Sequence, residues 1–116
     1  MSAGFKVYGK VFWGTNGAVE AYVEAMAAEA DTRFGPGDPM TIFFRDERDG
    51  FFGGKIVFLD EMLTDAASRD RFVQLLDAST EVLLRRNVFT EVGRSWVQTT
   101  VRDLRACLTA GPAGAG

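Results

Sequence analysis

Histidine is absent from this sequence of 116 residues, and cysteine occurs once, as Cys107. Imidazole and thiol groups supply most of the nucleophiles, proton shuttles and transition-metal ligands that proteins use near neutral pH. Their scarcity excludes serine-histidine and cysteine-histidine catalysis, metal sites built on histidine, and CxxC redox chemistry. The sequence therefore favours a non-catalytic protein, and it predicts no catalytic residue, no metal ligand and no cofactor.

Long apolar runs and targeting signals are also missing. No uninterrupted apolar run approaches the ~20 residues that a membrane-spanning helix requires. The first ten residues, MSAGFKVYGK, lack the apolar core of a signal peptide, and a lone cysteine cannot form an internal disulfide. We therefore expect a cytoplasmic protein that has no contact with a membrane.

The composition is that of a folded domain. Hydrophobic residues make up 47% of the chain and charged residues 25%, and ten Phe provide bulky material for a core. A chain of this length matches the common size of one domain, which folds without disulfides or metals. We predict a single α+β domain over residues 1–109, followed by a Gly/Ala-rich tail over residues 110–116.

The formal net charge of −3 is unevenly distributed. Of the 13 Lys and Arg residues, 8 lie within 1–81 and 5 within 82–116; of the 16 Asp and Glu residues, 14 and 2 lie in these segments. The C-terminal part is thus basic on an acidic body. Proteins that bind nucleic acid usually carry a basic excess over the whole domain, because phosphate contacts need cations. Nucleic acid is therefore a disfavoured partner.

Periodicity predicts a strand followed by a helix in the first third of the chain. Residues 5–13, FKVYGKVFW, alternate with the period of a half-buried strand. The turn over residues 14–17 contains Thr15 and Asn16, either of which can cap a helix. Apolar side chains then recur at helical spacing until Gly35 and Pro36 end the helix.

The middle of the chain has the composition of a β-hairpin. The β-rich runs at 40–46 and 51–59 are joined by a charged turn that ends in Asp49-Gly50. Gly53-Gly54 indicates a bulge in the second of these runs.

Two alternatives remain open in the last third. Thr64 is expected to cap a helix, and Ser79-Thr80 either lies inside this helix or ends it before a fourth strand over 81–86. A final helix is predicted from 90 to 108, with a hairpin as its rival because TEVGRSWVQTTV has high β-propensity.

These elements predict an α+β fold with the order β-α-β-β-α and a C-terminal helix. The sheet is expected to have three or four antiparallel strands, with the helices packed on one face. With a fourth strand at 81–86, the arrangement would be ferredoxin-like.

The outward face of this sheet is the candidate binding site. Strand alternation directs a set of basic and apolar side chains away from the helices: Lys6, Tyr8, Lys10, Phe12, Phe43, Arg45, Lys55, Val57 and Leu59. An exposed apolar area usually marks an interaction site. We expect this face to bind a second copy of the chain or another protein; single-stranded nucleic acid, or the C-terminal helix or tail as its cover, are the alternatives.

The rival function is a small-molecule-binding protein or enzyme with a pocket between sheet and helices. Such a pocket would use Tyr8 or Tyr22, Asp60 or Glu61, and an arginine. Common nucleotide fingerprints are absent, because no GxGxxG or Walker loop occurs. The charged run over 45–49 does not match the spacing of a calcium loop.

Overall fold

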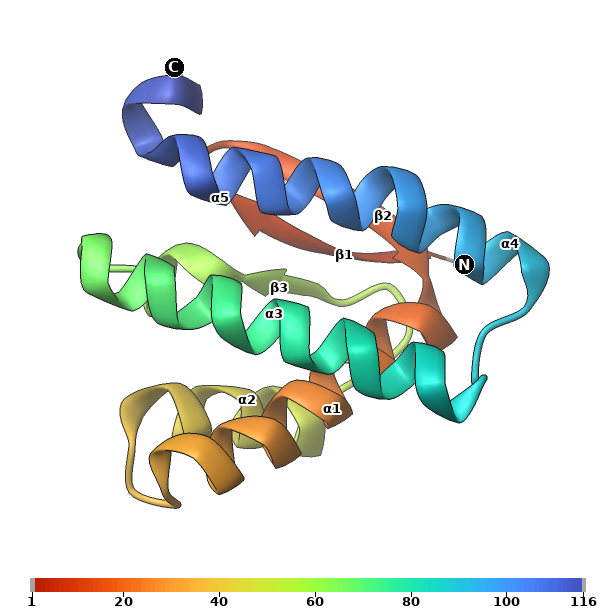
Figure 1. Ribbon diagram of the computed structural model, residues 1–116, viewed down its shortest axis with the longest axis horizontal. Helices are drawn as coiled ribbons and strands as arrows, with labels where there is room; N and C mark the ends of the chain where they lie inside the picture. The colour runs from red at the N-terminus through yellow and green to blue at the C-terminus, as the bar shows by residue number, and fades with distance from the viewer. Residues whose placement is uncertain (1, 116) are drawn as a thin grey trace.

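The computed structural model of the protein describes residues 2–115 and contains a mixed sheet with helices (Figure 1). The elements are β1 (Ser2–Val7), β2 (Lys10–Thr15), α1 (Asn16–Phe34), α2 (Pro39–Asp49), β3 (Ile56–Phe58), the short 3₁₀ helix η1 (Leu59–Glu61), α3 (Ala66–Arg86), α4 (Glu91–Trp96), the π-helical turn η2 (Val97–Val101) and α5 (Arg102–Ala115). The predicted α+β class is confirmed. The order of the strands and helices differs from the prediction in three places.

The first difference is a hairpin in place of the single strand over 5–13. The chain reverses at Tyr8 and Gly9, whose φ angles are 52° and 80°. Two successive positive φ angles form a type I′ turn, the tight turn that matches the twist of paired strands. The reversal sets Phe12 directly opposite Phe5 on β1. Both side chains therefore share one face of the sheet.

The second difference concerns the partner on the other side of β1. The strand order is β2-β1-β3, and β3 runs parallel to β1 with Phe5 opposite Val57. The sheet is thus mixed, and the antiparallel prediction is wrong. Only residues 56–58 of the predicted run 51–59 form a strand. Gly53-Gly54 belongs to a turn rather than a bulge, because the Lys55 amide donates to the Phe52 carbonyl at 3.2 Å.

The third difference is that α2 occupies the segment predicted as the strand 40–46. Asp38 caps this helix by accepting a hydrogen bond from the Met40 amide at 2.9 Å, and Pro39 is its first residue. An Asp cap followed by Pro is a strong helix start, and it outweighs the β-propensity of Thr-Ile-Phe-Phe. Gly50 ends the helix, so the predicted hairpin turn at Asp49-Gly50 is wrong.

Helix α3 is continuous from Ala66 to Arg86, so the predicted fourth strand over 81–86 does not exist. Its cap is Asp65 rather than Thr64, in a capping box with Ser68. The hydroxyl of Thr80 donates to the Leu76 carbonyl at 2.9 Å, so this threonine is accommodated within the helix. The ferredoxin-like arrangement is therefore wrong.

The helices predicted at the two ends of the chain are confirmed. Thr15 caps α1 by accepting from the Ala18 amide at 3.1 Å, and Gly35 ends it. Thr90 caps α4, and the helical path continues through η2 into α5, so the rival hairpin is wrong. Helix α5 kinks at Gly111 (φ 78°) within the segment predicted as a tail.

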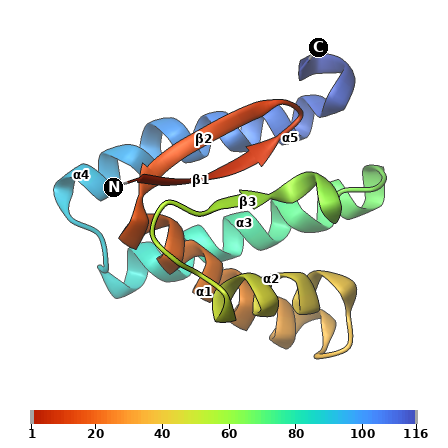
Figure 2. The same ribbon diagram turned by 180° about the vertical axis from the view of Figure 1, so that it is seen from behind.

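The core lies between one face of the sheet and the helices. Figure 2 shows the strands in front of α3 and α5, which run antiparallel to each other, while α2 packs against α1 beside them. The largest fully buried side chains come from both layers: Tyr22, Phe5, Phe44, Phe72, Met26, Leu59, Leu75, Leu76, Leu104, Leu108, Val7 and Val19. The sheet therefore has one covered face and one face without helices.

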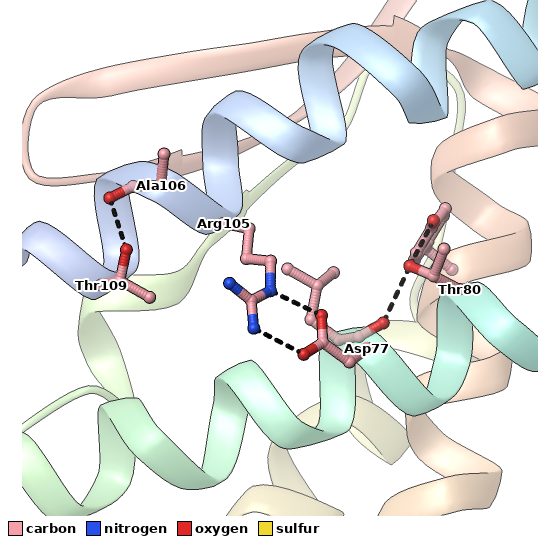
Figure 3. A network of polar contacts seen from close by, with 7 residues as sticks. Asp77, Thr80, Arg105, Ala106 and Thr109 are labelled. Carbon is pink, nitrogen blue, oxygen red and sulfur yellow. Dashed lines mark hydrogen bonds and ion pairs between the residues drawn. The ribbon is translucent and has the colours of Figure 1, made fainter.

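Polar contacts join α5 and α1 to the central helix α3. Figure 3 shows Arg105 of α5 reaching Asp77 of α3, with bonds of 2.8 and 2.9 Å. This pair is exposed and contributes little to stability, but its two parallel bonds fix the helix register. The buried Tyr22 hydroxyl lies 2.7 Å from the Thr80 hydroxyl, and burial raises the pKa of Tyr22 to about 12.

The indole of Trp96 attaches the C-terminal helical segment to β2. Its Nε1 donates to the Trp13 carbonyl at 2.6 Å, and its ring meets that of Tyr22 edge-on at 5.6 Å. Gly14 makes this approach possible: a Cβ at this position would lie 2.6 Å from the Trp96 ring. The close contact requires glycine because it leaves no room for a methyl group.

We predict that Gly14→Ala destabilises the protein by about 1–3 kcal/mol, since the new methyl group overpacks the Trp96 contact. Urea unfolding followed by tryptophan fluorescence measures this change. Gly17→Ala is the matched control, because a Cβ at Gly17 meets nothing within 4 Å and the helix gains propensity. Equal stability of the two variants would contradict the role of Gly14.

Candidate functional site

The sheet face without helices carries an apolar patch, which we call the open-face patch: Lys6, Val11, Trp13, Ile56 and Phe58. The strand register places these side chains together, because Lys6 lies between Val11 and Phe58 while Gly4 lies between Trp13 and Ile56. Side chains of directly paired residues point to the same face. The patch thus forms two short rows across the three strands.

Two aromatic side chains dominate the open-face patch. Trp13 is 51% exposed and Phe58 is 46% exposed. Gly4 has no side chain, and Val11 and Trp13 fill the space above it: their nearest side-chain atoms lie 2.9 and 3.3 Å from where a Cβ of residue 4 would stand. The Lys6 ammonium lies 5.7 Å from the centre of the Phe58 ring, within the range of a cation–π contact. Lys6 is the single charged side chain in the patch.

The structure does not bring the sequence-predicted site residues together on one face. Lys6 alone lies in the open-face patch. Phe12 shares the covered face with Phe5, and Val57 and Leu59 are fully buried. Their predicted outward orientation is wrong, because the turn at Tyr8-Gly9 and the register of β3 exchange the two faces.

The remaining predicted residues lie away from the patch. Tyr8 is in the hairpin turn and Lys10 is exposed at the start of β2, while Phe43 and Arg45 belong to α2. Lys55 precedes β3 and forms an ion pair with Glu47. The basic residues of the predicted site therefore do not line one surface. Helix α5 lies against the covered face, so the expectation that the C-terminal helix covers the outer face is also wrong.

Sequence reasoning missed Trp13, Ile56 and Phe58, which it assigned to the core. The signal that was available is the Tyr8-Gly9 pair between two alternating runs. Glycine at the second position of a two-residue loop favours a type I′ turn. Recognition of that turn reverses the parity of β2 and exposes Trp13.

The outer edge of β2 is partly closed. In a hairpin with a two-residue turn, the backbone groups of Val11 and Trp13 point away from β1. The Trp96 indole Nε1 donates a hydrogen bond to the Trp13 carbonyl at 2.6 Å. Because this carbonyl already has a donor, and the indole ring lies beside it, the addition of another strand is obstructed at this point. Contacts with other molecules are therefore more accessible through side-chain surfaces than through this edge.

A cavity of about 470 Å³ lies between the start of α2, the segment after η1 and the start of α3. Its apolar wall includes Met40, Phe43 and Met62, and its polar wall includes Asp38 and Arg71. The Arg71 guanidinium bonds Asp38 at 2.6 Å and stacks 4.1 Å from the centre of the Phe34 ring. The hydrogen bond from Arg71 lowers the pKa of Asp38, so this carboxylate is ionised at neutral pH.

The residues expected to form a pocket between sheet and helices are separated. Glu61 lines the cavity between α2 and α3, together with Arg71. Tyr22 is buried elsewhere against Thr80, and the Tyr8 amide donates to Asp60 at 3.2 Å at the end of the hairpin. These groups therefore do not form one reactive centre.

Neither a metal-ligand cluster nor a membrane-spanning helix is found among the residues that the structure describes. Within 2–115, no three His, Cys, Asp or Glu side chains come together in a way that could hold a metal ion. Over the same range, no helix combines the length and the apolar character needed to cross a bilayer.

Comparisons with protein families, with curated proteins and with solved structures find no match to this chain. The surfaces and cavities described above are therefore the basis for proposing a function.

We predict that Asp38→Ala lowers stability at neutral pH by about 1–2 kcal/mol, because it removes the α2 cap and the Arg71 partner. The folded state lowers the pKa of Asp38, so its contribution is present above the unfolded pKa and is lost as the pH falls through the folded pKa. The difference between wild type and variant should therefore shrink below about pH 4.

Urea unfolding at pH 7 and at about pH 3 measures this difference. Asp49→Ala is the control, since Asp49 is exposed and pairs only with the neighbouring Arg48. A difference between wild type and Asp38→Ala that is the same at both pH values would contradict the role of the carboxylate.

Proposed function

We propose that this protein is a non-catalytic interaction protein that forms a homodimer through the open-face patch. The observation that carries the proposal is the pair of half-exposed aromatic side chains, Trp13 and Phe58, on a sheet face that no helix covers. Contiguous apolar surface of this kind is costly to hydrate, and in folded proteins it usually marks an interaction site.

A second copy of the chain is the partner that fits the patch best. In a symmetric dimer the open-face patch of one chain meets the same patch of the other chain. The apolar residues and the lysine of the patch must therefore be able to lie beside their own copies. Lys6 is the only charge in the patch, and the aromatic rings of Trp13 and Phe58 can accept a cation on their faces. The patch therefore needs no acidic partner surface.

Aromatic side chains at the centre of a contact supply much of its binding energy. Trp and Phe each bury about 150–250 Å² when fully covered, so their exposed halves contribute roughly 100 Å² apiece. A dimer would cover two copies of each, surrounded by Val11, Ile56 and the stem of Lys6. This arrangement has the aromatic centre of many protein interfaces.

A small-molecule site in the cavity between α2 and α3 is the second candidate. Its volume of about 470 Å³ is within the range of ligand pockets. Three carboxylates line it, from Asp38, Glu61 and Asp65, against one guanidinium, from Arg71. The excess of negative charge beside apolar side chains suits an organic amine.

For the cavity we predict that 1,5-diaminopentane at millimolar concentration shifts the amide resonances of Met40, Met62 and Ser68 in NMR titrations. Glu61→Gln should weaken this binding roughly threefold, since it removes one exposed charge pair. Glutarate is the matched control, because its two carboxylates are repelled. Absence of shifts with the diamine, or equal shifts with glutarate, would exclude an amine site.

For the homodimer we predict twice the chain mass of 12.7 kDa by light scattering at micromolar concentration. Phe58→Glu should yield a folded monomer, because it removes one of the two aromatic side chains at the centre of the contact and places there a carboxylate that is solvated beside Lys6 in the monomer but would be desolvated in the dimer. Ile42→Glu is the matched control: Ile42 is exposed on α2, away from the sheet, and its variant should stay dimeric. A monomeric wild type at tens of micromolar would refute the dimer.

A further inference from the structure

A row of adjoining surface hollows, which we call the groove, runs along α1 and meets the open-face patch at Trp13. Three adjoining hollows of about 260, 260 and 170 Å³ make it up. Neighbouring hollows share lining residues: Thr15, Ala18, Val92 and Gly93 line the first and second, and Ala21 and Val88 line the second and third. The hollows therefore follow one another from the first turn of α1 to Ala28.

The floor of the groove is made of small side chains. Gly17, Ala18, Ala21, Ala25 and Ala28 line it from α1 at helical spacing. Small residues in such a row allow the backbone of another element to approach closely. From Gly17 to Ala28 the groove is about 17 Å long at the helical rise per residue, which corresponds to three turns of a partner helix.

The opposite wall carries aliphatic side chains that no element of the described chain covers. Val88 is 51% exposed and Val92 is 73% exposed, in the segment between α3 and α4 and in α4 itself. Val82 extends this wall along α3. Small residues on one side and branched aliphatic residues on the other form the kind of groove that receives the apolar stripe of an amphipathic helix.

The charges along the rim of the groove further restrict which helix could bind there. Glu20, Glu24 and Asp31 follow one another at i, i+4 and i+11 on α1, so they form one row beside the floor. All three are exposed, and none forms an ion pair with another described residue. Arg86 lies on the opposite wall. A helix in the groove would therefore meet a row of carboxylates along its α1 side and the Arg86 guanidinium on the opposite side.

We propose that this groove binds an amphipathic α-helix of a partner protein, with lysine or arginine on the flank that faces α1. The groove supplies the apolar contact, and the carboxylates of α1 select the basic flank and set the orientation of the helix. This inference does not depend on the homodimer. Trp13 borders both surfaces, so the variants that test the groove leave Trp13 unchanged.

The probes are three fluorescein-labelled peptides of fifteen residues. The first is an amphipathic helix with a leucine stripe and lysines on one flank; the second replaces these lysines by glutamates; the third has the composition of the first with its leucines scattered around the helix. Fluorescence anisotropy measures their affinities, and amide chemical shifts of the protein identify the site. We expect the lysine peptide to bind with shifts at Ala21, Val88 and Val92, the glutamate peptide roughly tenfold more weakly, and the scattered peptide not at all.

Two sets of variants separate the apolar contact from the charge contact. Val92→Glu should weaken binding of the lysine peptide about tenfold or more, whereas Leu84→Glu, an exposed α3 position outside the groove, should not. Glu20→Lys combined with Glu24→Lys should reverse the preference, so that the glutamate peptide binds more tightly. A purely structural disturbance would weaken both peptides without reversing their order.

Several results would overturn the proposal. These are no binding of the lysine peptide at millimolar concentration, equal binding of the scattered peptide, shifts confined to the sheet face, or an unchanged preference in the double lysine variant. The Phe58→Glu variant should bind the lysine peptide with unchanged affinity. Loss of peptide binding in Phe58→Glu would assign the peptide to the dimer face and refute an independent groove. A wild type that is monomeric and still binds the lysine peptide would refute only the dimer.

Discussion

The tight turn at Tyr8 and Gly9 is the constraint on which the arrangement of the sheet depends. Positive φ is unfavourable for a tyrosine, at a cost of about 1–2 kcal/mol, so the surrounding contacts must hold it. The Tyr8 amide donates to Asp60 at 3.2 Å, which joins the turn to the chain just after β3. β1 is the central strand because it pairs with β2 through this turn and with β3 on its other side. The turn fixes which side chains of β2 face the helices.

The contact between Trp96 and Gly14 has a corresponding role for the C-terminal helical segment. The indole hydrogen bond to Trp13 and the edge contact with Tyr22 hold this segment against β2 and the core. Because the ring also obstructs the edge of β2, the sheet is less open to strand addition there. Its exposed apolar side chains remain available on the open face. The contact of Trp96 with β2 therefore helps to decide whether the sheet offers its edge or its open face to other molecules.

The sequence predicted those elements whose signals are local. Helix α1 and the final helix follow from apolar periodicity. Thr15 is one of the two caps predicted for α1, and the final helix begins one residue after the predicted start at 90. The strand over 40–46 was wrong because β-propensity was weighed without the Asp38-Pro39 cap, a stronger local signal. The α+β class could be predicted because it depends only on the presence of both periodicities.

The candidate surfaces were harder to predict, because they depend on pairing across the chain. An outward face of basic and apolar side chains was expected, but the outward face carries Trp13, Ile56 and Phe58 rather than Phe12, Val57 and Leu59, and Lys6 is its charged residue. The missed turn at Tyr8-Gly9 exchanges the two faces of β2, and the register of β3 does the same for Val57, since neighbouring residues in a strand point in opposite directions. The groove along α1 had no sequence signal of its own. Its walls come from segments separated by more than fifty residues, and the packing of α3 against α1, followed by the segment that leads into α4, brings them together.

The distribution of charge and apolar surface supports interaction rather than catalysis. In the cavity, Arg71 is already bound to Asp38, and near β3 Lys55 is bound to Glu47, so the less exposed charges are paired. The large apolar side chains of the open-face patch and the groove have no such compensation in the described chain. Hydration of these side chains is unfavourable, and another macromolecule would remove it over a larger area than a small ligand can. This is the physical reason for proposing association through side-chain surfaces.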